Sequence, residues 1–112
     1  KQQEQASYLK EKLRERGLPA MASTTHIVPV MVGDAIKTSE ISWTLLQEHN
    51  LYIQPINYPT VPRGTERLRI TPGPLHTKEM IEHLVECLDS VFRQVQPPAY
   101  QPDFPPLNRL TG

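Results

Sequence analysis

Three arginines with close spacing are the residues of this chain best suited to binding an anion. Arg63, Arg67 and Arg69 all lie in the stretch INYPTVPRGTERLRITP (56–72). The planar guanidinium of arginine forms two parallel, charge-assisted hydrogen bonds with a carboxylate or phosphate. Two neighbouring cations also repel each other unless an anion lies beside them. The pattern therefore suits recognition of a small carboxylate or phosphate.

The segment RLRIT (67–71) should aim two of these arginines in one direction. Its composition predicts a strand, and successive side chains of a strand point to opposite faces. Leu68 and Ile70 would then hold the strand to the core, while Arg67 and Arg69 project together from the other face.

The ten-residue loop 57–66 directly precedes this strand. It is too long for a tight hairpin and has no periodicity, and loops of this kind are often functional. Its prolines would hold Thr60 and main-chain groups near the arginine face at little conformational cost. A second interpretation stays open, in which an arginine only forms a surface ion pair with Glu66 or another acidic side chain, an arrangement that contributes little.

The rest of the chain predicts an α+β domain. Apolar residues recur with helical spacing over 3–16, 39–49 and 77–95. Strand-forming residues cluster over 26–32, 51–56 and 67–71. Thr38 or Ser39 should cap the second helix and Thr77 the third. The expected fold is a small antiparallel or mixed sheet of about three strands with helices packed on it.

Some side chains have predictable places in these elements. The apolar run over 26–32 is typical of a strand covered on both faces. Pro29 has no N–H to donate, so it places this strand at a sheet edge or at a bulge. Ile41, Leu45 and Leu46 should face inward from the second helix.

The composition changes near residue 96. Five of the twelve prolines of this 112-residue chain fall in its last 16 residues. We therefore divide the chain into a small domain, 1–95, and a proline-rich, extended tail, 96–112, which should not build a core. PxxP-like matches in the tail could bind a partner, although a plain tail is the simpler interpretation.

Composition also excludes several functions. Lysine plus arginine and aspartate plus glutamate both number 12, so the net charge is zero. This balance argues against non-specific binding of nucleic acid, which needs a positive excess. The longest apolar run, IVPVMV, is too short to span a membrane. No glycine-rich phosphate loop, nucleophile elbow or metal-binding box is present.

Three further residues could do chemistry but have a structural interpretation. Cys87 could be a catalytic thiol, but its helical spacing from Leu84 and Val91 favours core packing. A single cysteine also suits a reducing compartment. His26 and His76 flank the ends of elements and are better interpreted as capping or hydrogen-bonding residues than as metal ligands.

The stretch YIQPINYPTVPRGTERLRITPGPLHT (52–77) resembles the C-terminal region of the α-oxoamine synthases, a family of pyridoxal-phosphate enzymes. The family signature is similar to PTVPxGTxRLRxT followed by a histidine, which His76 supplies here. The wording INY and PRGTERLRITP favours the aminolevulinate branch of this family. GLPAMASTTHIVPVMVGDA (17–35) resembles the strand that opens the C-terminal domain, and the resemblance covers roughly residues 5–95.

The resemblance implies a fold-type-I homodimer that condenses glycine with succinyl-CoA to 5-aminolevulinate, CoA and carbon dioxide in haem synthesis. It implies that Arg69 binds the glycine carboxylate and that Thr60 lies near the succinyl end of the acyl-CoA. It further implies a cytoplasmic enzyme in a bacterium or a mitochondrial-matrix enzyme in a eukaryote.

The resemblance also implies that this segment contains no catalytic residue. The family's Schiff-base lysine and the other pyridoxal-phosphate anchors lie upstream, so the cofactor and the chemistry belong to a large domain of the same enzyme. This segment alone should be inactive. Two alternatives stay open: another α-oxoamine synthase, or a stand-alone α+β module that binds an anion without catalysis.

Overall fold

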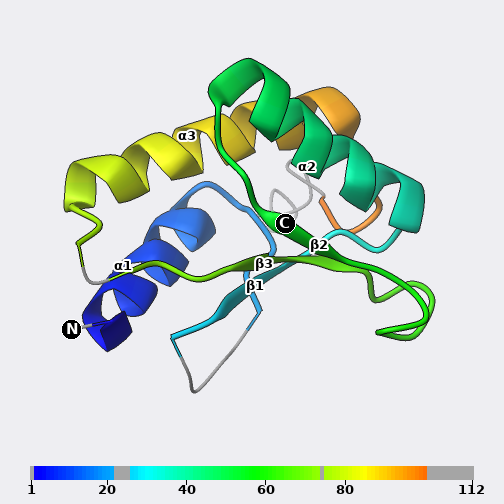
Figure 1. Cartoon of the computed structure of the whole chain (residues 1–112), viewed down its shortest axis with the longest axis horizontal. Helices are drawn as coiled ribbons and strands as arrows, with labels where there is room; N and C mark the ends of the chain where they lie inside the picture. Colours follow the sequence, from blue (N-terminus) through cyan, green and yellow to red (C-terminus); the bar gives the residue numbers. More distant parts are fainter. Residues whose placement is uncertain (1, 22–25, 74, 101–112) are drawn as a thin grey trace, which may run out of the picture.

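The computed structural model describes residues 2–21, 26–73 and 75–100. Within these ranges the chain forms three helices and three strands (Figure 1). In chain order they are α1 (Gln2–Glu15), β1 (Val28–Met31), α2 (Ala35–His49), β2 (Gln54–Ile56), β3 (Arg67–Ile70) and α3 (Lys78–Val95). The expected α+β fold is confirmed. None of the described helices combines the length and the apolar character needed to cross a membrane.

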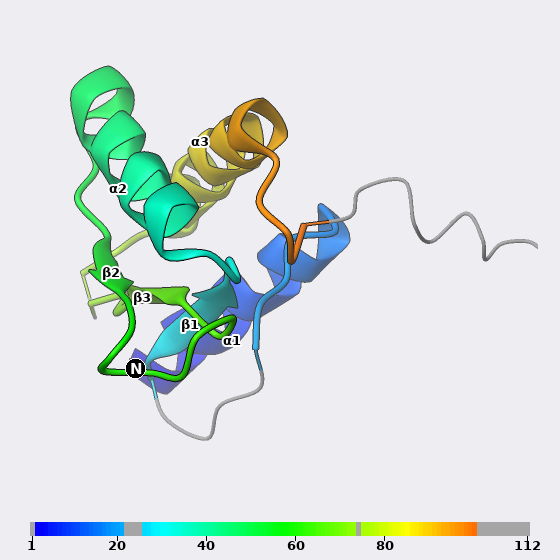
Figure 2. The same ribbon diagram turned by 90° about the vertical axis from the view of Figure 1, so that its right-hand side faces the viewer.

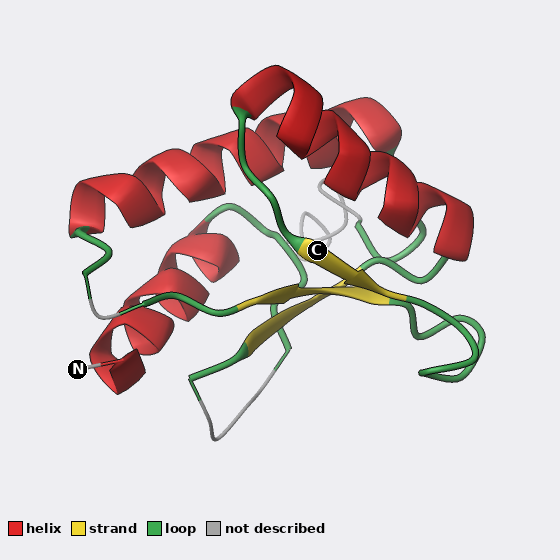
Figure 3. Ribbon diagram, viewed as in Figure 1, coloured by secondary structure: helices red, strands yellow, loops and turns green. Residues whose placement is uncertain are grey.

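The strands form one antiparallel sheet in the order β1-β3-β2, so β3 is central. Pro29 therefore lies in an edge strand, as its missing N–H predicted. Helix α2 packs against β2 and β3, and α1 packs against β1. Helix α3 packs against both of these helices. Figures 2 and 3 show α2 and α3 on the same side of the sheet.

The core lies between the sheet and the helices. Its largest fully buried side chains come from every helix and from two of the strands: Leu9, Leu13, Val28, Val30, Ile41, Leu45, Leu68, Leu88 and Phe92. The apolar stripe that predicted α3 faces this core, and Cys87 is buried with it. The core-packing interpretation of Cys87 is confirmed.

One helix start was predicted correctly and another was not. Thr77 caps α3 as expected. Helix α2, however, begins before Thr38 and Ser39, because Asp34 is its N-cap. The Asp34 carboxylate accepts a hydrogen bond of 2.9 Å from the Lys37 N–H. Thr38 is instead buried in the first turn and donates its hydroxyl to the Asp34 carbonyl oxygen. A carboxylate directly after a glycine was the missed signal.

Two predictions about burial were wrong. The segment 26–32 is not covered on both faces, because burial alternates along β1 and leaves Pro29 and Met31 half-buried. Leu46 does not face inward, since 40% of its surface is exposed. In both cases an apolar residue at a suitable position was expected to be covered, although its burial depends on which other element packs there.

The chain after α3 contributes to the core, which the sequence analysis did not expect. Tyr100 is 4% exposed, and its ring meets that of Phe92 edge to face with centroids 5.6 Å apart. The Ala99 N–H donates to the Val32 carbonyl oxygen at 3.0 Å. Residues 101–112 lie outside the described part, so a division into a domain (1–95) and a tail (96–112) stays a prediction.

Candidate functional site

Strand β3 places two arginines on the face of the sheet opposite the core. Arg69 pairs with Pro29 of β1 on one side and with Gln54 of β2 on the other. Arg67 occupies the next row toward the loop, on the same face. The alternation of burial along β3 confirms that Leu68 and Ile70 anchor the strand. The prediction that both arginines share one face is correct.

The two guanidiniums have different environments. Arg67 is half-buried, and its Nε donates to the Thr65 carbonyl oxygen at 2.9 Å. Arg69 is exposed, and its side chain has no hydrogen bond or ion pair with any other residue that the structure describes. The planar donor fork of Arg69 is therefore available to an anionic ligand.

The ion-pair interpretation of the arginines does not hold within the described residues. Glu66, the nearest acid in sequence, is 4% exposed. Its Oε1 accepts a hydrogen bond of 2.9 Å from the Gly64 N–H. The carboxylate thus serves the loop, and no ion pair between Glu66 and an arginine occurs among the described residues.

The third arginine does not join the other two. Arg63 is exposed in the loop 57–66, and its Cζ lies 4.0 Å from the ring centroid of Tyr58. This cation–π contact holds the guanidinium against the loop itself. Figure 1 shows the loop at the right-hand end of the sheet, beyond the start of β3. The structure therefore brings together Arg67 and Arg69 only.

Thr60 lies in the same loop. It is exposed, and its N–H donates to the Asn57 carbonyl oxygen at 2.9 Å in a turn. Thr60 is absent from the lining of the pocket beside Arg69. The role that the resemblance implies for Thr60 stays a prediction.

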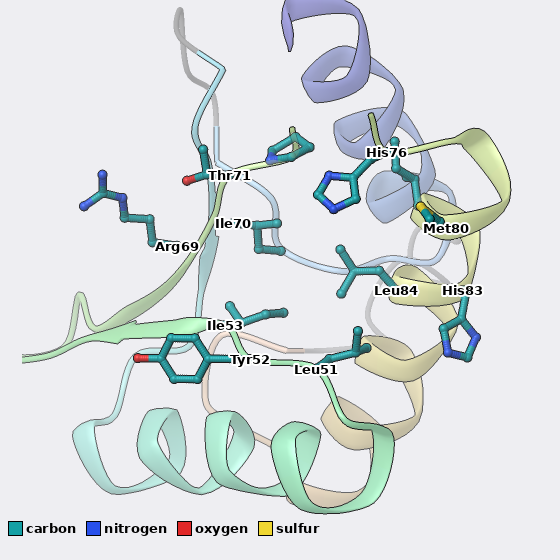
Figure 4. Close-up of a pocket in the computed structure, with 12 residues that line it drawn as sticks. Leu51, Tyr52, Ile53, Arg69, Ile70, Thr71, His76, Met80, His83 and Leu84 are labelled. Atoms are coloured by element: carbon teal, nitrogen blue, oxygen red, sulfur yellow. The ribbon is translucent and has the colours of Figure 1, made fainter. Parts of the chain in front are cut away.

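A pocket of about 380 Å³ adjoins the C-terminal end of β3. Its lining includes Ile53, Ile70, Ile81 and Leu84, with Arg69 at the rim. In Figure 4 the Arg69 side chain points away from these apolar side chains. The apolar pocket and the arginine face are thus two separate surfaces that meet along β3.

Two histidines and the cysteine have structural partners. His76 accepts at Nδ1 from the Gly73 N–H at 2.6 Å, so its hydrogen-bonding interpretation is confirmed. Nε2 of His83 lies 3.6 Å from Sγ of Cys87, a contact that the sequence analysis missed although the two residues are four positions apart on a helix. Burial, with the charge of Glu86 as a smaller cause, raises the pKa of the Cys87 thiol. A raised pKa disfavours the thiolate that a catalytic cysteine needs.

No cluster of three or more potential metal ligands occurs in the described ranges. The interpretation of His26 as a capping or hydrogen-bonding residue is not tested and stays a prediction.

Residues 1–88 match the sequence model of the family described as class I and II aminotransferases. This match covers most of the chain, which therefore belongs to the class I and II aminotransferase family. The three-stranded antiparallel sheet, packed against the helices, is the fold on which its candidate site is built.

Curated relatives with high sequence identity to this chain are 5-aminolevulinate synthases. The 5-aminolevulinate synthase of Bradyrhizobium diazoefficiens is 50% identical over 99 residues, a match that covers 88% of this chain and 24% of the relative. 5-Aminolevulinate synthase 1 of Cereibacter sphaeroides is 52% identical, covering 83% of this chain and 23% of the relative. The mitochondrial 5-aminolevulinate synthase of Saccharomyces cerevisiae is 44% identical, a match that covers 87% of this chain and 18% of the relative. The chain spans about a quarter of the length of the bacterial relatives.

Solved structures show the same fold. A structure described as SPT with a PLP internal aldimine superposes with a TM-score of 0.75 at 26% identity, covering 84% of this chain and 24% of that chain. A serine palmitoyltransferase from S. paucimobilis with a bound PLP–myriocin aldimine gives a TM-score of 0.72, also at 26% identity, with 85% and 24% covered.

Proposed function

We propose that this chain is the C-terminal small domain of a 5-aminolevulinate synthase and supplies its clamp for the substrate carboxylate. The whole enzyme would condense glycine with succinyl-CoA to 5-aminolevulinate, CoA and carbon dioxide, a step of haem and other tetrapyrrole synthesis. One observation supports the clamp: the exposed Arg69 guanidinium, which has no partner among the described residues, lies on the sheet face opposite the core in a chain about 50% identical to 5-aminolevulinate synthases.

Arg69 has the chemistry that a clamp requires. Its fork would donate hydrogen bonds to both oxygens of the glycine carboxylate, which fixes the orientation of the substituents on the α-carbon. Leu68 and Ile70 are buried on either side of it, so the strand that carries the guanidinium is held firmly. Thr60, one loop away, would contact the succinyl end of the acyl-CoA.

We propose that no residue of this segment anchors pyridoxal phosphate. Among the lysines in these ranges, Lys37 donates to the Val95 carbonyl oxygen at 3.1 Å, while Lys12 and Lys78 lie over the Tyr8 ring. The lining of the pocket beside Arg69 contains no lysine. When bound, the cofactor supplies an electron sink for a carbanion. We propose that the large domain of the same enzyme holds it.

In the whole enzyme the arginine face would lie against the large domain. Glycine would be bound between Arg69 and the large domain, so the small domain alone would be inactive. We propose that the enzyme is a homodimer, located in the cytoplasm of a bacterium or in the mitochondrial matrix of a eukaryote.

The test is substitution of Arg69 in the full-length enzyme. Arg69→Leu should lower kcat/KM for glycine by at least about 100-fold. Leucine has no donor, so the glycine carboxylate loses its bidentate charged contact and is left without a partner. Arg69→Lys should lose about tenfold, since an ammonium keeps the charge but not the fork. The dissociation constant for glycine should rise in the same order, and the KM for succinyl-CoA should change little.

The matched control is Arg14→Leu, which removes an exposed arginine of α1 far from β3 in sequence. It should leave both substrates unaffected. Unchanged glycine affinity in Arg69→Leu would reject the clamp. Tight binding of glycine by this 112-residue chain alone would instead favour a stand-alone anion-binding module.

A further inference from the structure

Glu66 is a buried carboxylate at the junction between the loop 57–66 and strand β3. It is 4% exposed, although it lies between exposed or half-buried neighbours. Removing a carboxylate from water is costly unless hydrogen bonds replace the lost hydration. Its burial therefore needs a structural counterpart, and the arginines beside it in sequence do not provide one among the described residues.

That counterpart is the second half of the loop. Glu66 Oε1 accepts from the Gly64 N–H at 2.9 Å. Gly64 has a φ of +86°, in the left-handed region that favours glycine. The adjoining turn is closed by Thr65, whose N–H and hydroxyl both donate to the Pro62 carbonyl oxygen, at 3.0 Å and 2.6 Å. A short run of main chain is thus fixed around one carboxylate.

The main chain of Glu66 is fixed as well. Its carbonyl oxygen accepts from the N–H groups of Val32 and Gly33, both at 2.9 Å. These residues follow the end of β1. Glu66 therefore connects the end of one strand, the start of another and the loop between β2 and β3.

The first half of the loop has its own anchor and is linked to the second half. The side-chain amide of Asn57 donates to the Ser39 hydroxyl of α2 at 3.2 Å. The stacking of Arg63 on Tyr58 then joins the two halves at 4.0 Å. Thr60 lies between them. Thr60 therefore lies in a stretch of loop whose two ends, Tyr58 and Arg63, are in contact.

We infer that Glu66 is a positioning residue for the acyl-CoA substrate, because its carboxylate holds the loop in the conformation that places Thr60. The inference rests on the proposed function. The acceptor oxygen and its reach are the required features, and the negative charge is not. Glycine binding by Arg69 depends on β3 and should be insensitive to the loop.

The experiment compares Glu66→Gln with Glu66→Asp in the full-length enzyme. Glutamine keeps the side-chain length and an acceptor oxygen for the Gly64 N–H, whereas aspartate keeps the charge but is one methylene too short. Glu66→Asp should raise the KM for succinyl-CoA about tenfold, the upper range for the loss of one hydrogen bond. Glu66→Gln should stay within about twofold, and the KM for glycine should stay within about twofold in both variants.

Thermal unfolding of each variant, with Glu48→Asp on the exposed surface of α2 as a control, separates positioning from general destabilisation. A merely structural role would change the two KM values in parallel or lower only the melting temperature. Either result would overturn the inference, as would an equal effect of the two substitutions. If Arg69→Leu leaves glycine affinity intact, the proposed function fails whatever Glu66 does. If Arg69 behaves as proposed and Glu66→Asp leaves the KM for succinyl-CoA unchanged, only the role of Glu66 fails.

Discussion

The two faces of strand β3 differ in the groups that contact their side chains. On the core face, Leu68 and Ile70 are covered by apolar side chains from the helices. On the other face, Arg67 bonds to the loop that precedes it, and the Arg69 side chain has no partner within the described residues. One face is complete within this chain, whereas the other carries a donor fork that a ligand could use.

This difference shows that stability and binding are separable along a single strand. Burial of apolar area holds β3 in place and is independent of the identity of any ligand. An exposed guanidinium contributes little to folding but binds an anion strongly when an adjoining surface excludes water. Substitutions at adjacent positions should therefore have effects of different kinds.

The largest expected effect follows from Leu68→Ala. The Leu68 side chain is fully buried, and its truncation leaves a cavity. The substitution should therefore lower the free energy of unfolding by about 2–5 kcal/mol. Arg69→Ala, one residue along, should change that free energy by no more than about 0.5 kcal/mol. Urea unfolding of the chain followed by circular dichroism measures both. Similar losses in the two variants would show that the two faces are not separable.

A smaller effect is expected in the loop that adjoins the arginine face. Gly64→Ala should cost about 1–2 kcal/mol, because its φ of +86° is strained for a residue with a Cβ. No atom lies within 4 Å of the added Cβ, so the cost would be conformational and not steric. Gly73→Ala is the control, since its Cβ would meet His76 at an ordinary 3.7 Å. The same unfolding experiment applies, and equal stability of both variants would contradict the strain.

The smallest effect concerns the thiol on the core side. Burial raises the pKa of Cys87 above its value in the unfolded chain, so the folded state disfavours the thiolate. This contribution to stability is fully present below the unfolded pKa and is lost as the pH rises through the folded pKa. Iodoacetamide at pH 8.5 should therefore react more slowly with the folded chain than with the chain in urea. Equal rates would mean that Cys87 is accessible, and Cys87→Ser provides the blank.

Much of the fold could be predicted because its signals are local. The apolar stripe of α3, its Thr77 cap and the alternation along β3 depend only on residues within each element. Leu46 and the full burial of 26–32 were predicted wrongly because an apolar residue at the right spacing is not always covered. Its exposure depends on which other element packs there, and spacing contains no information on that.

The candidate site was predictable only in part, for the same reason. The motif around RLRIT singled out Arg69 as a candidate, and strand geometry predicted the face to which its side chain points. An ion pair between Glu66 and an arginine was one of two interpretations, and the bond of Glu66 to Gly64 was missed. The signal was an acidic residue two positions after a glycine in a turn, which is common in sequences and rarely decisive on its own.

The sequence by itself determined the helices and strands, the shared face of Arg67 and Arg69, and the resemblance to one enzyme family, because these follow from spacing and residue type. Only the tertiary structure decided that β3 is central, that Glu66 is buried against the loop and that Tyr100 returns to the core against Phe92. Those features join residues far apart in the chain or depend on how much of a side chain is exposed to solvent. Both are set by packing, which no local pattern contains.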